Sequence, residues 1–388
     1  MKDRNILKFQ SFYFVLVGAV GCFVPYINVY LENNIGLTGS QIGLMTAASL
    51  IVGVCVIPIW GIIGDKTRKY NLLLLVSLSA SIVALYFYSK QTVYIGCLVF
   101  ALLLEVSRLG TQPMADAISM NYTSKHGGNY GSIRGMGSLG YMIGSMVVGF
   151  LADIYGLDGP LFTSYILLLG IALLICLSFP KTTDEEEKDK PKGHNFKELL
   201  VNKNFLFMLL IVMMTQIVVD SSGAYAGNHL ITTLHGSTSL ISWLNFVQVF
   251  PEFLFLMIAS QVIKKMGYKK FFFIAMTLMA IRLYTYALVP NAYVFVGISI
   301  VHCLGVACST VASLAYIQES VNPSVFGTAI TLLNAAMSIS KAILGYIFGA
   351  VYQYVGSYQI FLISAIIVTI SVILIAATKR FDTPKSDE

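Results

Sequence analysis

Charged residues are scarce in this chain, and so are the residue types that build most enzyme and metal sites. Only 11% of the 388 residues are Asp, Glu, Lys or Arg, whereas a soluble globular chain is about one quarter charged. The six cysteines form no CxxC pair, and the five histidines form no cluster at metal-ligand spacing. No GxSxG, HExxH or P-loop sequence occurs. We therefore do not expect an ordinary soluble domain or a disulfide framework. We also expect no metal site, no cofactor and no enzymatic activity.

Apolar residues fill the chain instead, at 56% of the sequence with a mean hydropathy of +0.76. A membrane-spanning helix needs about 20 apolar residues in succession. Reading for such stretches predicts an all-α membrane protein with twelve transmembrane helices. They lie near residues 10–31, 40–63, 71–89, 92–119, 132–154, 160–180, 204–228, 239–263, 271–289, 292–317, 325–352 and 358–378.

Basic residues gather in alternate loops and not on one face, which argues against nucleic-acid binding. By the positive-inside rule these loops are cytoplasmic, which places both termini on the cytoplasmic side of the cell membrane. The intervening loops are nearly free of Lys and Arg. The basic residues beside helix ends are Lys2, Arg4, Lys8, Lys66, Arg68, Lys69, Lys125, Lys264, Lys265, Lys269, Lys270, Lys379 and Arg380.

One long hydrophilic run, residues 181–203, interrupts the apolar pattern close to the midpoint. Its mixed charge and low apolar content are typical of a solvated linker. The run leaves six predicted helices in residues 1–180 and six in residues 204–388. Such a repeat predicts two six-helix bundles that rock about a central binding site in the membrane.

The loop after the second helix resembles the cytoplasmic signature of the major facilitator superfamily, in which an Asp and basic residues latch neighbouring helices. Gly61, Asp65, Lys66, Arg68 and Lys69 carry the resemblance, although the family's central Gly is missing. The resemblance implies the major facilitator fold, with Asp65, Lys66 and Arg68 in a gating role.

Charges in the fourth and fifth predicted helices carry a closer resemblance. Asp116 and Arg134 lie 18 residues apart, and Tyr141 follows seven residues later. This pattern resembles the lactose permease group of oligosaccharide and proton symporters, and related phenylpropionate-type permeases. In the lactose permease group the matching residues bind the sugar, because charged groups bond to vicinal hydroxyls and an aromatic face covers the ring. The alternative is a clamp between two helices, and the same pair also resembles that of non-sugar relatives.

A second set of charges lies in the eighth to tenth predicted helices. Arg282 and His302 keep the spacing of an Arg and a His that serve proton coupling and sugar binding in the lactose permease group, and Glu252 resembles its essential Glu. Opposite charges in neighbouring helices let a carboxylate stay ionised until a proton or substrate replaces its partner. For His302, a structural hydrogen bond is the alternative.

The proton carrier of the lactose permease group is a Glu one turn after that His, and this chain has Gly305 there. Coupling then needs another carboxylate, with Glu252, Glu105 and Asp116 as candidates, or it is altered altogether. Glu105 lies one turn before Arg108, where it predicts an internal ion pair or an enlarged polar cavity.

Asp220 and Lys341 resemble an interhelical salt bridge of lactose permease at the same separation of 121 residues. A buried pair of this kind is mostly structural, because removing one partner leaves an unpaired charge. We assign it to structure or gating.

Together these features predict a monomeric secondary transporter that works by alternating access. Its predicted cargo is a sugar, either an oligosaccharide or a glycoside, and its transport is coupled to protons. The alternative is a permease or exporter of the same fold for an aromatic acid, a nucleoside or a drug. The 22 tyrosines and 24 phenylalanines would suit the flat ligands of this alternative, but aromatic residues also populate membrane interfaces.

Overall fold

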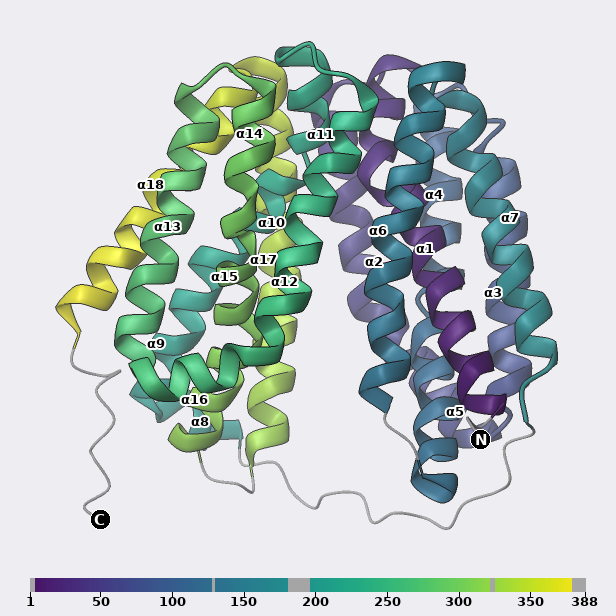
Figure 1. Cartoon of the computed structure of the whole chain (residues 1–388), viewed down its shortest axis with the longest axis horizontal. Coiled ribbons are helices and arrows are strands. Elements are labelled where there is room, and N and C mark those ends of the chain that lie inside the picture. Colours follow the sequence, from purple (N-terminus) through teal and green to yellow (C-terminus); the bar gives the residue numbers. More distant parts are fainter. Residues whose placement is uncertain (1–3, 128–129, 181–195, 322–324, 379–388) are drawn as a thin grey trace. The chain divides into compact units, whose positions relative to one another are not determined.

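The protein is described by a computed structural model that covers residues 4–127, 130–180, 196–321 and 325–378 (Figure 1). In these ranges all regular secondary structure is helical. Twelve helical spans are long and apolar enough to cross a membrane, and each overlaps one of the predicted stretches. The predicted all-helical class with twelve spans is therefore confirmed.

The first six spans are built from seven helices, because the fourth span is interrupted. Continuous helices form the other five. The bounds are Arg4–Asn33 for α1, Gly39–Thr67 for α2, Tyr70–Tyr88 for α3, Tyr94–Arg108 for α4, Thr111–His126 for α5, Tyr130–Tyr155 for α6 and Asp158–Leu177 for α7.

Interruptions are more frequent in the later spans, where π-helical segments (η1, η2 and η4) and one 3-10 segment (η3) separate short α-helices. The bounds are Phe196–Val201 for α8, Lys203–Val212 for α9, Met213–Ile217 for η1, Val218–Gly223 for α10, Ala226–Asn228 for α11, His229–Thr233 for η2, Thr238–Met266 for α12, Tyr268–Leu288 for α13, Ala292–Ile298 for α14, Ser299–Val301 for η3, His302–Ala307 for α15, Cys308–Ala312 for η4, Ser313–Ser320 for α16, Phe326–Tyr354 for α17 and Ser357–Ala377 for α18.

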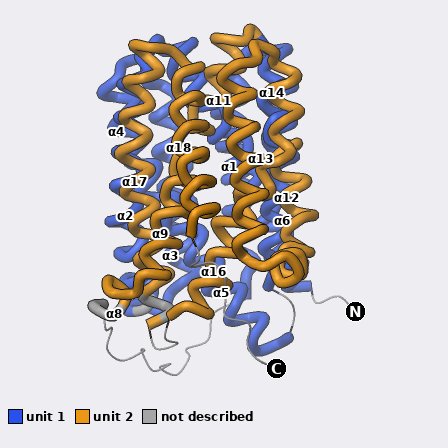
Figure 2. The backbone as a smooth tube through the Cα atoms, turned by 90° about the vertical axis from the view of Figure 1, so that its left-hand side faces the viewer, with its two compact units in different colours: residues 1–188, 236–245 blue, residues 189–235, 246–388 orange. Residues whose placement is uncertain are grey.

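The chain divides into two compact units (Figure 2). Unit 1 comprises residues 1–188 and 236–245, and unit 2 comprises residues 189–235 and 246–388. Residues 181–195 of the predicted linker lie outside the described residues. Part of the remainder is helical: α8 occupies residues 196–201, and Leu199 is buried in the hydrophobic core of unit 2.

Glycines bring α1 and α6 of unit 1 into backbone contact. A Cβ atom on Gly140 would lie 2.0 Å from the carbonyl oxygen of Phe14, and one on Gly144 would lie 2.2 Å from that of Gly18. Small residues allow such close approach between membrane helices. This close packing fixes α6 against α1, the helix that forms one wall of the site below.

Candidate functional site

The fourth span is broken in its middle, between the end of α4 at Arg108 and the start of α5 at Thr111. Pro113 has no N–H group, so it cannot donate to the carbonyl of Leu109 one turn earlier. Gly110 donates to Ser107 at 3.4 Å, not to Val106 as a continuous α-helix requires. A proline and a glycine therefore release backbone carbonyls in the middle of a membrane helix.

Side chains of neighbouring helices donate hydrogen bonds to two carbonyls at the break. The indole N–H of Trp60 in α2 donates to the Val106 carbonyl at 2.8 Å, and the hydroxyl of Ser77 in α3 donates to the Ser107 carbonyl at 2.5 Å. The ring of Trp60 lies against Gly110, where a Cβ atom would come within 2.4 Å of it. Backbone that is not helical is tolerated at membrane depth only where it is satisfied in this way or lines a cavity. Both conditions are met here.

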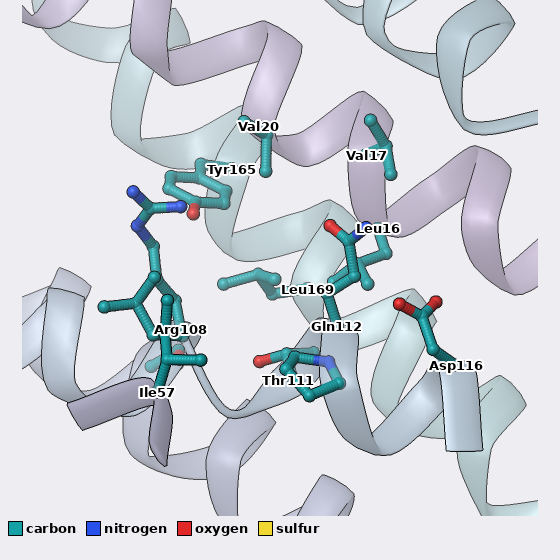
Figure 3. Close-up of a pocket in the computed structure, with 13 residues that line it drawn as sticks. Leu16, Val17, Val20, Ile57, Arg108, Thr111, Gln112, Asp116, Tyr165 and Leu169 are labelled. Carbon is teal, nitrogen blue, oxygen red and sulfur yellow. The ribbon is translucent and has the colours of Figure 1, made fainter. Parts of the chain in front are cut away.

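A cavity of about 340 Å³ opens beside the break and lies wholly within unit 1 (Figure 3). This volume is at the lower end of the range for small-molecule sites, about 300–1,000 Å³. Its walls come from α1, α2, α3, α4, α5 and α7. The polar lining residues are Ser81, Arg108, Thr111, Gln112, Asp116 and Tyr165, and the apolar ones are Leu16, Val17, Val20, Ile57, Leu109, Pro113 and Leu169.

Arg108 and Glu105 form the predicted ion pair within α4. Nη2 of Arg108 donates to Oε1 of Glu105 at 2.6 Å. The two side chains are unequally placed, since Arg108 is 32% exposed and lines the cavity, while Glu105 is 17% exposed and does not. The ion pair, one of the two alternatives for these residues, is therefore confirmed, and Arg108 also lines the polar cavity.

Asp116 and Arg134 are not in direct contact. Oδ1 of Asp116 accepts hydrogen bonds from the phenols of Tyr13 and Tyr130, and its carboxylate forms no salt bridge with a described residue. Gln112 contacts Arg134 instead: in the amide orientation that satisfies both groups, its oxygen accepts from Nη2 and Nε at 3.0 and 3.1 Å. The uncharged amide of Gln112 thus occupies the guanidinium of Arg134, and the substrate-binding role of Asp116 and Arg134 stays a prediction.

The sequence-predicted residues meet the cavity only in part. Asp116 lines it, Arg134 reaches it through Gln112, and Tyr141 is not among its lining residues. Sequence reasoning missed Thr111, Gln112, Ser81 and Tyr165 as site residues. The signal for them was the pairing of Gly110 with Pro113 inside an apolar stretch, since glycine and proline interruptions of membrane helices often mark binding sites.

In unit 2 the tenth span is also interrupted, by the 3-10 segment η3, which ends at Val301 just before His302. Arg282 of α13 is 3% exposed and donates through Nε to the phenol of Tyr286 at 2.9 Å. Its Nη1 lies 2.9 Å from Nδ1 of His302. An Arg side chain only donates, so Nδ1 of His302 is the acceptor and carries no proton. The predicted proximity of Arg282 and His302 is confirmed, as is a hydrogen bond to His302.

Aromatic side chains close this cluster. The ring of Tyr286 stacks on Phe295 with centroids 3.7 Å apart, and Phe361 packs edge-on against both rings. The Tyr286 phenol also bonds to Ser299 of η3 at 2.5 Å. Arg282, Tyr286, His302 and Ser299 thus bond to one another and form a closed cluster.

Glu252 lies in α12 one residue after Pro251, and within the described chain it forms no salt bridge with Arg282. The predicted pairing of these two charges is wrong for this structure, because Tyr286 and His302 occupy the guanidinium. Asp220 and Lys341, by contrast, form the predicted salt bridge, and Gln216 donates to Asp220 at 2.8 Å. That bridge joins α10 to α17 within unit 2.

The latch residues lie at the end of α2. Lys66 and Arg68 are exposed, and Arg68 adopts the left-handed conformation that ends the helix, with φ of 53°. The side chain of Asp65 lies outside the described residues, so the gating role stays a prediction. In the part of the chain that the structure describes, no group of His, Cys, Asp and Glu side chains is placed to hold a metal ion.

Twelve membrane spans and a polar cavity beside a broken helix define a membrane transporter for a small molecule. The chain belongs to the MFS_1 like family, whose profile matches residues 6–381. It is thus a multi-pass transporter of the major facilitator superfamily and not an enzyme.

Two curated relatives cover most of the chain. The maltose permease of Geobacillus stearothermophilus is 26% identical over 334 residues, covering 84% of this chain and 82% of the permease. The probable 3-phenylpropionic acid transporter of Escherichia coli K12 is 22% identical over 358 residues, covering 89% of this chain and 90% of the relative. Both bear out the resemblance carried by the charged residues of the sequence.

Among solved structures, the nucleoside transporter NupG superimposes with a TM-score of 0.82, covering 97% of this chain and 99% of NupG at 17% sequence identity. At this level of identity the likeness shows the fold. The predicted major facilitator fold is therefore confirmed.

Proposed function

We propose that the protein is a proton-coupled symporter that brings a saccharide, an oligosaccharide or a glycoside, into the cell. The observation that carries the proposal is the cavity of unit 1, in which Asp116, Gln112 and Arg108 face one volume beside a broken membrane helix. Charged side chains are expensive at membrane depth, and those that line a cavity are usually kept for a ligand.

The lining chemistry suits a saccharide. Asp116 accepts hydrogen bonds from hydroxyls, Arg108 donates to them, and Gln112 and Thr111 do both. The ring of Tyr165 and the apolar residues of α1 offer a surface for the C–H face of a sugar. The printed function of the maltose permease relative supports the same substrate class.

Protonatable groups are available for coupling in both units. Glu252 lies in a membrane span without a salt bridge in the described chain, and Arg282 lies in a neighbouring span without an acidic partner. We infer that Glu252 carries a proton, and that Arg282 receives its carboxylate when the proton leaves. His302 then positions Arg282, and Glu105 is the second candidate carrier.

Alternating access would expose the cavity to each side of the membrane in turn, with both termini on the cytoplasmic side. The basic loops of the sequence support this orientation. Asp220 and Lys341 would hold α10 to α17 during the change, and Asp65, Lys66 and Arg68 would latch helix ends.

A permease for an aromatic acid is the second candidate. Arg108 favours it, because a guanidinium in a cavity can bind a carboxylate and Tyr165 can stack on a ring. The printed name of the probable 3-phenylpropionic acid transporter agrees with this candidate.

External alkalinisation of lightly buffered, de-energised cells tests the proposed function. Cells that express the protein receive disaccharides, glycosides, nucleosides and aromatic acids in turn. We expect alkalinisation with a saccharide or glycoside, because each substrate molecule draws in a proton. The response should vanish in Asp116→Asn. No response to any saccharide, with the protein present in the membrane, would contradict the proposal.

A further inference from the structure

We propose that the substrate carries a carboxylate group and that Arg108 binds it in the cavity of unit 1. This inference deepens the proposed function and rests on it, since it assigns an acidic glycoside to the same cavity. The carboxylate would lie at the Arg108 end and the sugar hydroxyls at the Asp116 end.

The placement of the ion pair carries the first step. Glu105 takes one hydrogen bond from Nη2 of Arg108 and stays out of the cavity lining, whereas the Arg108 side chain lines it. Among the described residues, only Glu105 accepts a hydrogen bond from Arg108. The other N–H groups of the guanidinium therefore remain for a ligand. A planar guanidinium binds a carboxylate through two parallel hydrogen bonds, which no hydroxyl can match.

The register of the lining residues carries the second step. Arg108, Gln112 and Asp116 follow one another at four-residue intervals and share one face of the broken span. Figure 3 shows the guanidinium of Arg108 beside Tyr165 and the carboxylate of Asp116 on the opposite side, with Gln112 between them. Eight residues correspond to roughly 12 Å of helix. A ligand with an acid at one end and hydroxyls at the other matches this order of charges.

Charge balance carries the third step. Arg108 and Glu105 together are neutral, so a bound carboxylate adds one negative charge to a site at membrane depth. One proton taken from the medium by Glu105 restores neutrality and frees Arg108 for the ligand. The other titratable groups around this pair are Tyr165 of α7, Tyr88 of α3 and Asp116 across the cavity. Of these groups, Glu105 is the one in direct contact with Arg108.

Three probes that share a phenyl ring test the inference on the purified full-length transporter. Phenyl glucuronide has a sugar and a carboxylate, phenyl glucoside has the sugar alone, and 3-phenylpropionate has the carboxylate alone. Dissociation constants are measured for wild type and for the double variant Glu105→Gln with Arg108→Gln, which removes both charges and leaves none unpaired. A matched control is Asp220→Asn with Lys341→Gln, which removes a second membrane-embedded ion pair, in unit 2.

We expect wild type to bind the glucuronide roughly 10- to 100-fold more tightly than the glucoside, the range that charge-assisted hydrogen bonds provide. The ratio should fall to about one in the Arg108 double variant and stay unchanged in the control. Tighter or equal binding of the glucoside would overturn the inference and leave the proposed saccharide transport standing. Binding of 3-phenylpropionate as tight as the glucuronide, lost with Arg108, would support the carboxylate site and overturn the saccharide assignment.

The single variant Glu105→Gln gives a readout that a merely structural pair would not move. Removing the competing carboxylate should tighten binding of the glucuronide. It should also reduce the proton uptake that accompanies binding, measured by a pH indicator on mixing. Unchanged proton uptake in Glu105→Gln would overturn the exchange of partners at Arg108.

Discussion

The fourth and the tenth spans are both interrupted, yet they use their polar groups in opposite ways. In the fourth span, Arg108, Gln112 and Asp116 turn toward an open cavity. In the tenth, Ser299 and His302 turn toward Tyr286 and Arg282, under a cover of aromatic rings. The first arrangement leaves donors and acceptors for a ligand, and the second consumes them within the protein.

The difference separates binding from support. A polar group that faces a cavity gains a partner only when a ligand arrives, so its replacement should change affinity more than stability. A polar group that is satisfied internally contributes to the folded state, so its replacement should change stability more than affinity. The substitutions below test this separation, from the largest expected effect to the smallest.

Asp116→Asn should lower substrate affinity by roughly 100-fold, because charge-assisted hydrogen bonds to the ligand are lost. The fold should persist, since the Asn side-chain oxygen can still accept from Tyr13 and Tyr130. Tracer binding and thermal unfolding of the purified protein measure the two effects. Asp158→Asn, at the start of α7, is the matched control and should bind as wild type does. Uptake by Asp116→Asn at the wild-type rate would place the substrate elsewhere.

Gly110→Ala should destabilise unit 1 by about 1–3 kcal/mol, the usual cost of overpacking, because the added methyl group meets the ring of Trp60. Movement of Trp60 would also release the Val106 carbonyl and reshape the cavity, so affinity should fall with stability. Gly170→Ala in α7 is the control, since a Cβ atom there meets nothing within 4 Å. Equal melting temperatures for the two variants would show that the broken helix does not depend on this contact.

Tyr286→Phe should lower stability by about 1–2 kcal/mol and leave affinity unchanged, because the phenol bridges Arg282 and Ser299 inside the closed cluster. Tyr284→Phe, in the same helix, removes only a 3.4 Å hydrogen bond from Thr369 and should change stability little. Thermal unfolding and tracer binding again provide the readouts. Loss of affinity in Tyr286→Phe without loss of stability would mean that the tenth span binds substrate directly.

Ser77→Ala should cost roughly 1 kcal/mol, because one donor to the Ser107 carbonyl is lost while the Gly110 N–H remains. Ser89→Ala, at the exposed end of α3, removes a local hydrogen bond to Tyr86 and serves as the control. The difference in melting temperature between the two variants measures the contribution of Ser77 to the broken helix. No difference would show that solvent in the cavity replaces the serine.

The sequence specified the spans better than the contacts between them. Twelve spans follow from apolar length, which is a local property of each segment. The partners of Asp116 and Arg134 depend on how two helices are rotated about their axes, which a spacing of 18 residues leaves open. Gln112 took the place of Asp116 at Arg134 for this reason, since both residues lie on one face of α5.

The cluster of Arg282, Tyr286, Ser299 and His302 also shows that the sequence predicts contacts less well than spans. Arg282 and His302 meet as their spacing predicted, but the phenol of Tyr286 could not be identified as a partner from charge alone. The salt bridge of Asp220 with Lys341 was predictable because the resemblance named both partners. The cavity itself was not, since its walls come from six helices and its cause, the break at Gly110 and Pro113, lies within a stretch that reads as one span.

The claim that the fourth span, and not the tenth, binds substrate is tested most directly by measuring whether a ligand protects cysteine thiols from alkylation. In a background without the other native cysteines, one variant carries Val20→Cys, which lines the cavity, and another keeps Cys303 beside His302. Alkylation by N-ethylmaleimide is timed with and without phenyl glucuronide. Slower alkylation of the introduced thiol at position 20, with no change at Cys303, is the predicted result. Protection of Cys303 with none at position 20 would contradict the account.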